Sequence, residues 1–175
     1  HTETLPARTG RHGEWPSWLP QDFRDHLVDQ GIAQPWAHQV RVANALWDRH
    51  DAVVATGTSS GKSLGYQMPI LTTLAEEKNA TALYLTPTKA LANDQLAHVA
   101  GMTHEVGSLR GVSIGGYDGD TPPEARRAIR DSVQWVFTNP DMVQLSVLGA
   151  HARWGSRGRC LIHQGVPLPL ASPLI

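Results

Sequence analysis

Cysteine is nearly absent from this sequence, since Cys160 is the only one among 175 residues. A single cysteine cannot form an intramolecular disulfide, and it cannot build the multi-cysteine sites that hold zinc or iron–sulfur clusters. This usage is typical of proteins in a reducing compartment, so we expect a cytoplasmic protein. The nine histidines lack the paired spacing of metal ligands on a helix. We therefore interpret them as solvated or hydrogen-bonded side chains.

Long apolar runs and a strong charge of one sign are also missing. No stretch approaches the roughly 20 apolar residues of a membrane helix, and the first residues lack a signal-peptide pattern, so we expect no membrane partner. The net charge of −1 excludes a broad basic surface, although a local basic groove is compatible with it. No Asp or Glu follows Asp141, so the last 34 residues of the chain contain no acidic side chain.

Short apolar runs alternate with amphipathic segments through most of the chain. Strands are expected at residues 52–55, 82–85, 111–114 and 133–138. Helices are expected at residues 21–30, 35–48, 62–75, 89–99, 121–131 and 139–148, the fifth with a hydroxyl cap at Thr121. Strands that alternate with helices predict an α/β domain with a mostly parallel sheet flanked by helices.

The two ends of the chain differ from this pattern. Residues 1–20 carry three prolines and predict an extended arm, in which Trp15 and Trp18 are expected to pack against the domain. After Trp154 the sequence has neither a helix nor a strand period, and prolines recur in it. We therefore divide the chain into an arm with a short helix (1–34), a partial domain (35–154) and an atypical proline-rich tail (155–175).

A phosphate-binding loop is predicted where an expected strand meets an expected helix. In such a P-loop, backbone N–H groups cradle phosphates, a lysine reaches the outer phosphates and a hydroxyl ligates Mg²⁺. The end of the segment matches this pattern, but its first position is threonine where glycine is usual. The predicted nucleotide ligands of the loop are Thr56, Gly57, Thr58, Ser59, Ser60, Gly61, Lys62 and Ser63, with Ser63 as the metal ligand.

Further segments occur around this loop in a fixed order. They are PWAHQ at residues 35–39, ATGTSSGKSLGYQMPIL at 55–71, TPTKALANDQ at 86–95, YDGDTP at 117–122 and TNPD at 138–141. Together they resemble the Q motif, motif I, motif Ia, the glycine motif and motif Ib of superfamily 2 DEAD/DEAH-box helicases. Within that superfamily the sequence is similar to the first RecA-like domain of the Lhr-like and RecQ-related DNA helicases.

The resemblance implies ligands as well as a fold. ATP and Mg²⁺ are the implied cofactors, with Gln39 at the adenine and with Lys62 and Ser63 as the catalytic residues. Nucleic acid, DNA rather than RNA, is the implied partner, contacted by Pro87, Thr88, Lys89, Gly119, Thr138, Asn139, Pro140 and Asp141. From chemistry alone Gln39 could be a surface amide, and Thr88 could simply cap a helix. Residues 117–122 could form a plain turn, since two aspartates repel phosphate.

The resemblance stops near residue 154, before motif II. In the family this next motif supplies the Asp-Glu pair that holds the metal, and a second RecA-like domain then supplies arginine fingers. We therefore expect an incomplete P-loop NTPase domain, the ATP- and nucleic-acid-binding portion of an ATP-dependent DNA helicase, inactive alone. Two alternatives stay open here, a non-functional gene remnant and a P-loop small-molecule kinase.

Overall fold

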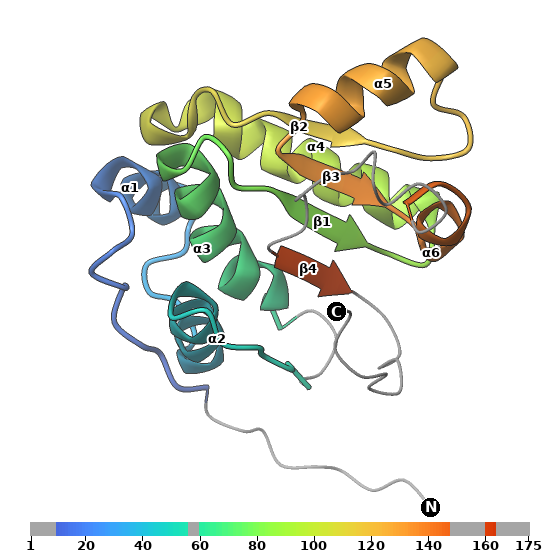
Figure 1. Cartoon of the computed structure of the whole chain (residues 1–175). Helices are drawn as coiled ribbons and strands as arrows, with labels where there is room; N and C mark the ends of the chain where they lie inside the picture. The colour runs from blue at the N-terminus through green and yellow to red at the C-terminus, as the bar shows by residue number, and fades with distance from the viewer. Residues whose placement is uncertain (1–9, 56–59, 148–159, 164–175) are drawn as a thin grey trace, which may run out of the picture. The chain divides into compact units, whose positions relative to one another are not determined.

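The computed structural model describes residues 10–55, 60–147 and 160–163 (Figure 1). The chain divides into two compact units. The first unit contains the chain up to Thr72 together with residues 106–108, and the second contains residues 73–105 and the chain from Leu109 onward. Each unit is described below by itself.

Three helices form the first unit. Helix α1 (Gln21–Asp29) buries Phe23 and Leu27, which lie one turn apart, and it ends before Gly31, whose φ is +90°. Helix α2 (Ala37–Trp47) follows, and helix α3 (Lys62–Glu76) belongs to this unit as far as Thr72. Their apolar faces form one core, whose buried side chains include Leu19, Phe23, Leu27, Ala43, Met68 and Leu71.

Tryptophans of the N-terminal arm pack against the helices of this unit, as predicted. The ring of Trp18 stacks on that of Trp47 in α2, with centroids 4.4 Å apart and planes 6° from parallel. The Trp18 indole N–H also donates to Asn44 Oδ1 at 3.0 Å, and the Trp15 indole N–H donates to the Ala33 carbonyl at 3.4 Å. The arm therefore covers apolar surface while both indole N–H groups keep acceptors.

The second unit is built on a four-stranded parallel sheet. Its strands are β1 (Ala82–Leu85), β2 (Ile114–Gly116), β3 (Trp135–Thr138) and β4 (Cys160–His163), in the order β2-β3-β1-β4. The register pairs Leu85 with Thr138, so β1 and β3 end side by side. The helical segments of this unit are α4 (Lys89–Glu105), α5 (Pro123–Ser132), α6 (Pro140–Met142) and the π-helical turn η2 (Val143–Val147).

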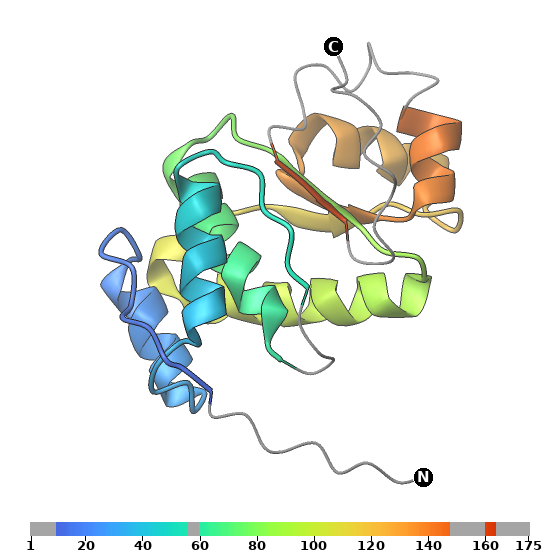
Figure 2. The ribbon, with the colours of Figure 1, turned by 90° about the horizontal axis from the view of Figure 1, so that it is seen from below.

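Both faces of this sheet are covered, as expected of parallel strands. Figure 2 shows α4 on one side of the sheet and α5 and α6 on the other. Tyr84 and Phe137 lie on one face with ring centroids 5.0 Å apart, and Trp135 packs on Phe137 at 5.1 Å. On the opposite face Val136 packs in a cluster with Tyr117 and Met142. The predicted α/β arrangement is confirmed.

Two predictions about strands are wrong. Residues 52–55 are not a strand, and Val53 is 89% exposed. Residues 160–163, where the tail showed no strand period, pair parallel with β1. With β4 on one side and β3 on the other, β1 is an inner strand of the described sheet.

The start of α5 also differs from its prediction. Thr121 does not cap this helix, because the N-cap is Pro122 and no side chain caps the first turn. The Thr121 hydroxyl instead accepts from the Asp118 N–H at 2.9 Å. A turn before the helix therefore competes successfully for the hydroxyl.

Candidate nucleotide and nucleic-acid sites

Gln39 joins the two segments that are predicted to bind nucleotide, both of which lie in the first unit. It is 4% exposed and stands in the first turn of α2, where its Oε1 accepts from the Trp36 N–H at 2.7 Å. Its Nε2 donates to the Gly61 carbonyl, also at 2.7 Å, although these residues lie 22 apart in the sequence. Gln39 is thus no ordinary surface amide, because both ends of its side chain are engaged.

Gly61 is required at this contact for two reasons. Its φ is +68°, a left-handed conformation that strains other residues. A Cβ built on Gly61 would also lie 2.7 Å from Gln39 Nε2, closer than real Cβ contacts. A side chain on Gly61 would therefore strain the backbone and force the Gln39 amide to move.

Ser60 and Lys62 flank Gly61 and also make contacts in the first unit. His38 Nε2 lies 3.1 Å from the Ser60 carbonyl oxygen, which accepts a hydrogen bond. Lys62 begins α3, and its Nζ donates to Ser60 Oγ at 3.3 Å. Ser63 follows, half-buried, in the first turn of α3. The remaining predicted ligands, Thr56, Gly57, Thr58 and Ser59, lie outside the described residues.

The described part of the loop has chemistry that suits a nucleotide with its metal ion. A lysine and a hydroxyl stand at the N-terminus of α3, where the helix dipole favours phosphate. Among the residues that the structure describes, no group of three or more His, Cys, Asp or Glu side chains could hold a metal ion. Within this part of the chain, Mg²⁺ would therefore depend on Ser63 and on the phosphates themselves.

The predicted nucleic-acid contacts lie in the second unit, after the ends of β1 and β3. These strands end side by side, and the Thr86 N–H donates to the Thr138 carbonyl at 3.1 Å. Thr138 is 2% exposed, and its hydroxyl donates to the Tyr117 carbonyl. The carboxyl edge of a parallel sheet is where ligands of α/β proteins commonly bind. In this unit, however, the Thr138 hydroxyl is already hydrogen-bonded to the backbone of Tyr117.

Residues 87–89 form an exposed approach to α4. Pro87, Thr88 and Lys89 are all exposed, and Thr88 Oγ1 accepts from the Leu91 N–H at 3.3 Å. Thr88 is therefore a helix cap, a role that is compatible with contacting phosphate. The Thr86 hydroxyl is buried and has no hydrogen-bond partner within the described parts of the chain.

Residues 139–141 form the start of the short helix α6. The Asn139 side chain caps this helix by accepting from the Met142 N–H at 2.9 Å. Pro140 occupies the first helical position, and Asp141 is exposed. Asn139 therefore combines a structural cap with a half-buried position at the same sheet edge.

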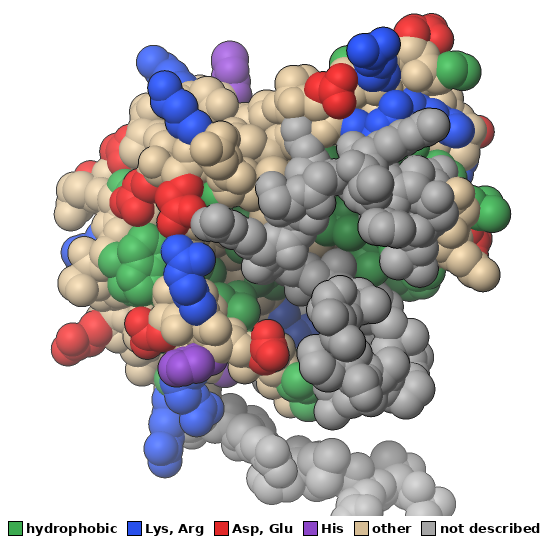
Figure 3. All heavy atoms as spheres, viewed as in Figure 1, with side chains coloured by type: hydrophobic (Ala, Val, Ile, Leu, Met, Phe, Trp, Pro, Cys, Tyr) green, Lys and Arg blue, Asp and Glu red, His purple; other side chains and the backbone are tan. Residues whose placement is uncertain are grey.

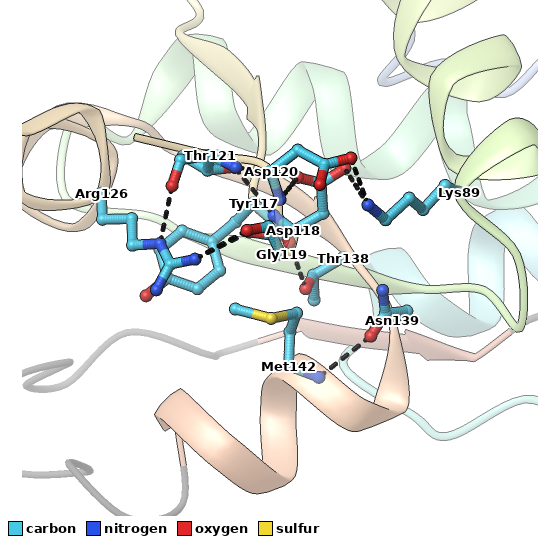
Figure 4. A network of polar contacts seen from close by, with 10 residues as sticks. All are labelled: Lys89, Tyr117, Asp118, Gly119, Asp120, Thr121, Arg126, Thr138, Asn139 and Met142. Atoms are coloured by element: carbon cyan, nitrogen blue, oxygen red, sulfur yellow. Dashed lines mark hydrogen bonds and ion pairs between the residues drawn. The ribbon is translucent and has the colours of Figure 1, made fainter. Parts of the chain in front are cut away.

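The loop at residues 117–121 is a tightly bonded turn (Figure 4). Asp118 Oδ1 accepts from the N–H groups of Asp120 and Thr121, at 2.9 and 3.1 Å. The Arg126 guanidinium donates to the carbonyls of Thr121, Gly119 and Asp118, at 2.8, 3.1 and 3.4 Å. Gly119, a predicted contact, is exposed at the tip of this turn. The turn thus has a defined geometry before any ligand binds.

Lys89 forms ion pairs with two acids of this turn. Its Nζ lies 2.5 Å from Asp120 Oδ2 and 3.8 Å from Asp118 Oδ2. The hydrogen bond to Asp120 is the main cause that raises the pKa of Lys89, and the same bond lowers the pKa of Asp120. From the sequence, these two aspartates were expected to repel phosphate. In the structure they also neutralise Lys89, which is itself a predicted phosphate ligand.

Sequence reasoning did not find the role of Arg126. The Asp-Gly-Asp-Thr composition of residues 118–121 is typical of a side-chain-bonded turn and could have indicated the hydrogen bonds of Asp118. Nothing comparable marks Arg126, one of several arginines in α5. Its function depends on where the preceding turn places three carbonyl oxygens.

Charges of both signs are interspersed over the described part of the face shown in Figure 3. This distribution agrees with a net charge of −1. No helix of the described chain is long and apolar enough to cross a membrane. Electrostatic attraction of a nucleic acid would therefore be a local property, as at Lys89.

Comparison with known families identifies this set of motifs. Residues 36–162 match the model of the DEAD/DEAH box helicase family. The chain belongs to this family. The match begins at the N-cap of α2, passes through both candidate regions and reaches into β4. The family predicted from the motif order is thus confirmed, and the match runs beyond residue 154.

Individual helicases are similar to the chain over most of its length. The ATP-dependent helicase hrq1 of Schizosaccharomyces pombe is 38% identical over 152 residues, which cover 86% of this chain and 14% of the relative. The crystal structure of the DUF1998 helicase MrfA bound to DNA and AMPPNP has a TM-score of 0.78 at 33% identity, covering 84% of this chain and 20% of that one. The chain thus spans a fifth or less of these proteins.

A more distant structure agrees in fold alone. The helicase Lhr of Mycobacterium smegmatis, bound to ssDNA and AMP-PNP, is 19% identical with a TM-score of 0.67, covering 85% of this chain and 25% of that one. The predicted RecA-like fold is therefore confirmed. The three-part division of the chain and the roles of the individual site residues stay predictions.

Proposed function

We propose that this chain is the nucleotide- and nucleic-acid-binding portion of an ATP-dependent DNA helicase. The observation that carries the proposal is the hydrogen bond between Gln39 and Gly61, which connects the Q-motif helix to the phosphate loop. The bond partner is the left-handed glycine of the Gly61-Lys62-Ser63 segment itself, a contact that a glutamine exposed on the helix surface would not make. Family membership supports ATP as the nucleotide, since the relative hrq1 is named an ATP-dependent helicase.

In this proposal each residue of the first unit has a distinct task. Gln39 keeps a second amide hydrogen and a second oxygen lone pair beyond its two internal bonds, and these could pair with an adenine edge. Lys62 neutralises the outer phosphates, and Ser63 ligates Mg²⁺. When bound, Mg²⁺ neutralises phosphate charge during hydrolysis. The other proposed phosphate ligands are Ser60 and residues 56–59, of which the latter lie outside the described part of the chain.

In the second unit, the carboxyl edge of the sheet would contact one nucleic-acid strand. The exposed residues 87–89 bring a helix N-terminus, a hydroxyl and an ammonium group to the same place. Phosphate contacts of this kind position a strand without reading its sequence. We propose DNA as the strand because the solved MrfA structure at 33% identity contains DNA.

The chain alone is expected to bind these ligands without unwinding DNA. Phosphoryl transfer needs a Walker B acid for the metal, and an arginine finger alone contributes about 10³–10⁵ in rate. No acidic residue follows Asp141 in this sequence. Mg²⁺ use, a preference for DNA and a cytoplasmic location are parts of the proposal.

A two-ligand titration tests it. A fluorescent ATP analogue and a fluorescent single-stranded oligonucleotide are each titrated with the full chain and with Lys62→Ala. The substitution removes a charged phosphate ligand, so nucleotide binding should weaken at least about tenfold while DNA binding persists. Lys78→Ala is the matched control, since Lys78 is an exposed lysine outside both sites.

Three outcomes would contradict the proposal in different ways. Equal nucleotide affinity in Lys62→Ala and Lys78→Ala would remove the phosphate role of the loop. Binding of neither ligand by the wild-type chain would support an inert remnant. Phosphorylation of a small acceptor would support the kinase alternative.

A further inference from the structure

Lys89, a predicted phosphate ligand, already has an anionic partner. Its ammonium group, 44% exposed, pairs with the carboxylate of Asp120, which is 87% exposed. Asp120 comes from the turn at residues 118–121, 31 residues further along the chain. The ion pair therefore joins the N-terminus of α4 to a separate loop in the same unit.

The turn is built so that Asp120 faces Lys89. Asp118 fixes the backbone by accepting from two N–H groups of the turn, and Arg126 fixes three of its carbonyls. The Asp120 side chain takes no part in these bonds, and its hydrogen-bond partner is Lys89. In Figure 4 the two side chains point toward each other across the gap between α4 and the turn.

A carboxylate in this position has the chemistry of a bound phosphate oxygen. Both are anionic acceptors, and both are favoured where the free N–H groups of a helix N-terminus lie. Lys89 is the first residue of α4, a helix that extends to Glu105. Asp120 can therefore satisfy the ammonium group as a strand phosphate would.

We propose that Asp120 acts as an internal competitor for the strand phosphate at Lys89, so that nucleic acid binds at the start of α4 only by displacing it. This inference rests on the proposed nucleic-acid site and adds a regulatory contact to it. Displacement is feasible because an exposed ion pair is weak. Breaking it would lower the affinity for the strand by no more than about fivefold. Arg126 is a positioning residue in this scheme, since it holds the turn that carries Asp120.

Asp120→Asn is the variant that isolates the competitor. It removes the carboxylate charge but keeps the side-chain shape and the backbone bonds of the turn. Asp118→Asn would be unsuitable because Asp118 Oδ1 holds the turn itself. The matched control is Asp131→Asn, which removes the same charge from another exposed pair, with Arg127 at 3.7 Å in α5.

Binding of a fluorescent single-stranded DNA oligonucleotide is measured at several salt concentrations. Asp120→Asn should bind about two- to fivefold more tightly than the wild type at low salt. Its dependence of log K on log salt should steepen by up to about 0.7, the value for one phosphate contact on a single strand. Asp131→Asn should show a smaller gain in affinity and a smaller change in salt dependence than Asp120→Asn.

A double-mutant cycle separates competition at Lys89 from general electrostatics. In a Lys89→Ala background the competitor has nothing to block, so Asp120→Asn should bring no gain there. A gain that persists without Lys89, or one that Asp131→Asn equals, would overturn the proposal. So would an unchanged affinity in Asp120→Asn while the wild-type chain binds DNA.

A second readout judges the contact without any DNA. The rate at which an acylating reagent modifies Lys89, followed by mass spectrometry, should increase several-fold in Asp120→Asn, because the shorter of its two ion pairs is lost and only that with Asp118 at 3.8 Å remains. The rate should be unchanged in Asp131→Asn. If the wild-type chain binds no DNA at low salt, the proposed nucleic-acid function is contradicted even when Lys89 becomes more reactive. If Lys89 reacts equally in all three proteins, the competitor itself is contradicted.

Discussion

The proposed nucleotide region and the proposed strand-binding region are held in place by opposite means. Around Gln39 and Gly61 a buried, neutral side chain bridges two backbone segments in a space that admits no extra methyl group. Around Lys89 exposed charges pair with one another. The turn that carries Asp120 is open at Gly119, where nothing lies within 4 Å of an added Cβ. The first region depends on shape and the second on charge.

This difference indicates which property each region can change. Buried hydrogen bonds are costly to leave unmade, so the Gln39 contact is expected to persist through ligand binding. Exposed ion pairs contribute little to stability, so the Lys89 contact can exchange partners at low cost. The first unit is thus suited to a rigid site and the second to an exchangeable one.

The largest expected effect is that of Gly61→Ala. An alanine at the φ of +68° costs about 1–2 kcal/mol. Its Cβ would also lie only 2.7 Å from Gln39 Nε2, so the Gln39 amide would have to move. With the loss of that hydrogen bond, the free energy of unfolding should fall by about 2–3 kcal/mol. Urea denaturation followed by tryptophan fluorescence measures the change.

Gly101→Ala is the control for this substitution. Gly101 lies within α4, and nothing lies within 4 Å of a Cβ built there. The same chemical change should therefore stabilise the chain by up to about 1 kcal/mol. Equal effects of the two substitutions would show that shape does not distinguish the nucleotide region.

Arg126→Lys should have an intermediate effect on the charged region. An ammonium group cannot reach the three carbonyls that the guanidinium binds, so the turn should loosen. Stability should fall by less than about 1 kcal/mol, while amide hydrogens of residues 119–121 exchange several-fold faster. Arg127→Lys, a change at an exposed arginine one residue along, should leave that exchange unaltered. An unfolding cost as large as that of Gly61→Ala would contradict the contrast between the regions.

The smallest effect is expected at Asp22. Like Lys89 it is an exposed charge, and like Gln39 it is bonded to the backbone of a segment far along the chain. Its exposed carboxylate accepts from the Ser108 N–H at 2.6 Å and lies 3.0 Å from the Phe23 N–H. Burial raises the pKa of Asp22, but hydrogen bonds from Ser108 and Phe23 outweigh it, and the net pKa is lowered. The stabilisation is therefore present above the unfolded value of about 3.9 and is lost as the pH falls through the folded pKa.

Asp22→Asn tests this dependence. At neutral pH the substitution should cost less than about 0.5 kcal/mol, because the amide oxygen can still accept a hydrogen bond and only an exposed charge is lost. Denaturation curves from pH 7 to pH 2.5 should bring the two proteins together at the acid end, where the wild-type carboxyl group is protonated. If the difference in the free energy of unfolding between the two proteins stayed constant over this pH range, the charge of Asp22 would not contribute to stability.

Elements with local signals were predicted from the sequence. Helix α1 ends before Gly31, and β1 coincides with the expected apolar run at residues 82–85. The segment at residues 52–55 has the same local character but is not a strand, because a β-prone run becomes a strand only when a neighbouring strand pairs with it. The pairing of β4 with β1 is non-local in the same sense.

The candidate sites show a similar limit. The residue types of the phosphate loop and of motif Ia were predicted from spacing and resemblance. The partners of those residues were not, since Gln39 meets Gly61 and Lys89 meets Asp120 only after the chain folds. Sequence patterns thus indicated which groups have useful chemistry, while the fold decides which of them are already engaged.

The stacked pair of Trp18 and Trp47 has an optical consequence. Two indoles 4.4 Å apart and 6° from parallel are close enough for their excited states to couple, which would produce a circular-dichroism band pair in the first unit. In the second unit the fully buried Trp135 would report through its emission wavelength. One unlabelled sample could therefore reveal whether the two units unfold together or in sequence.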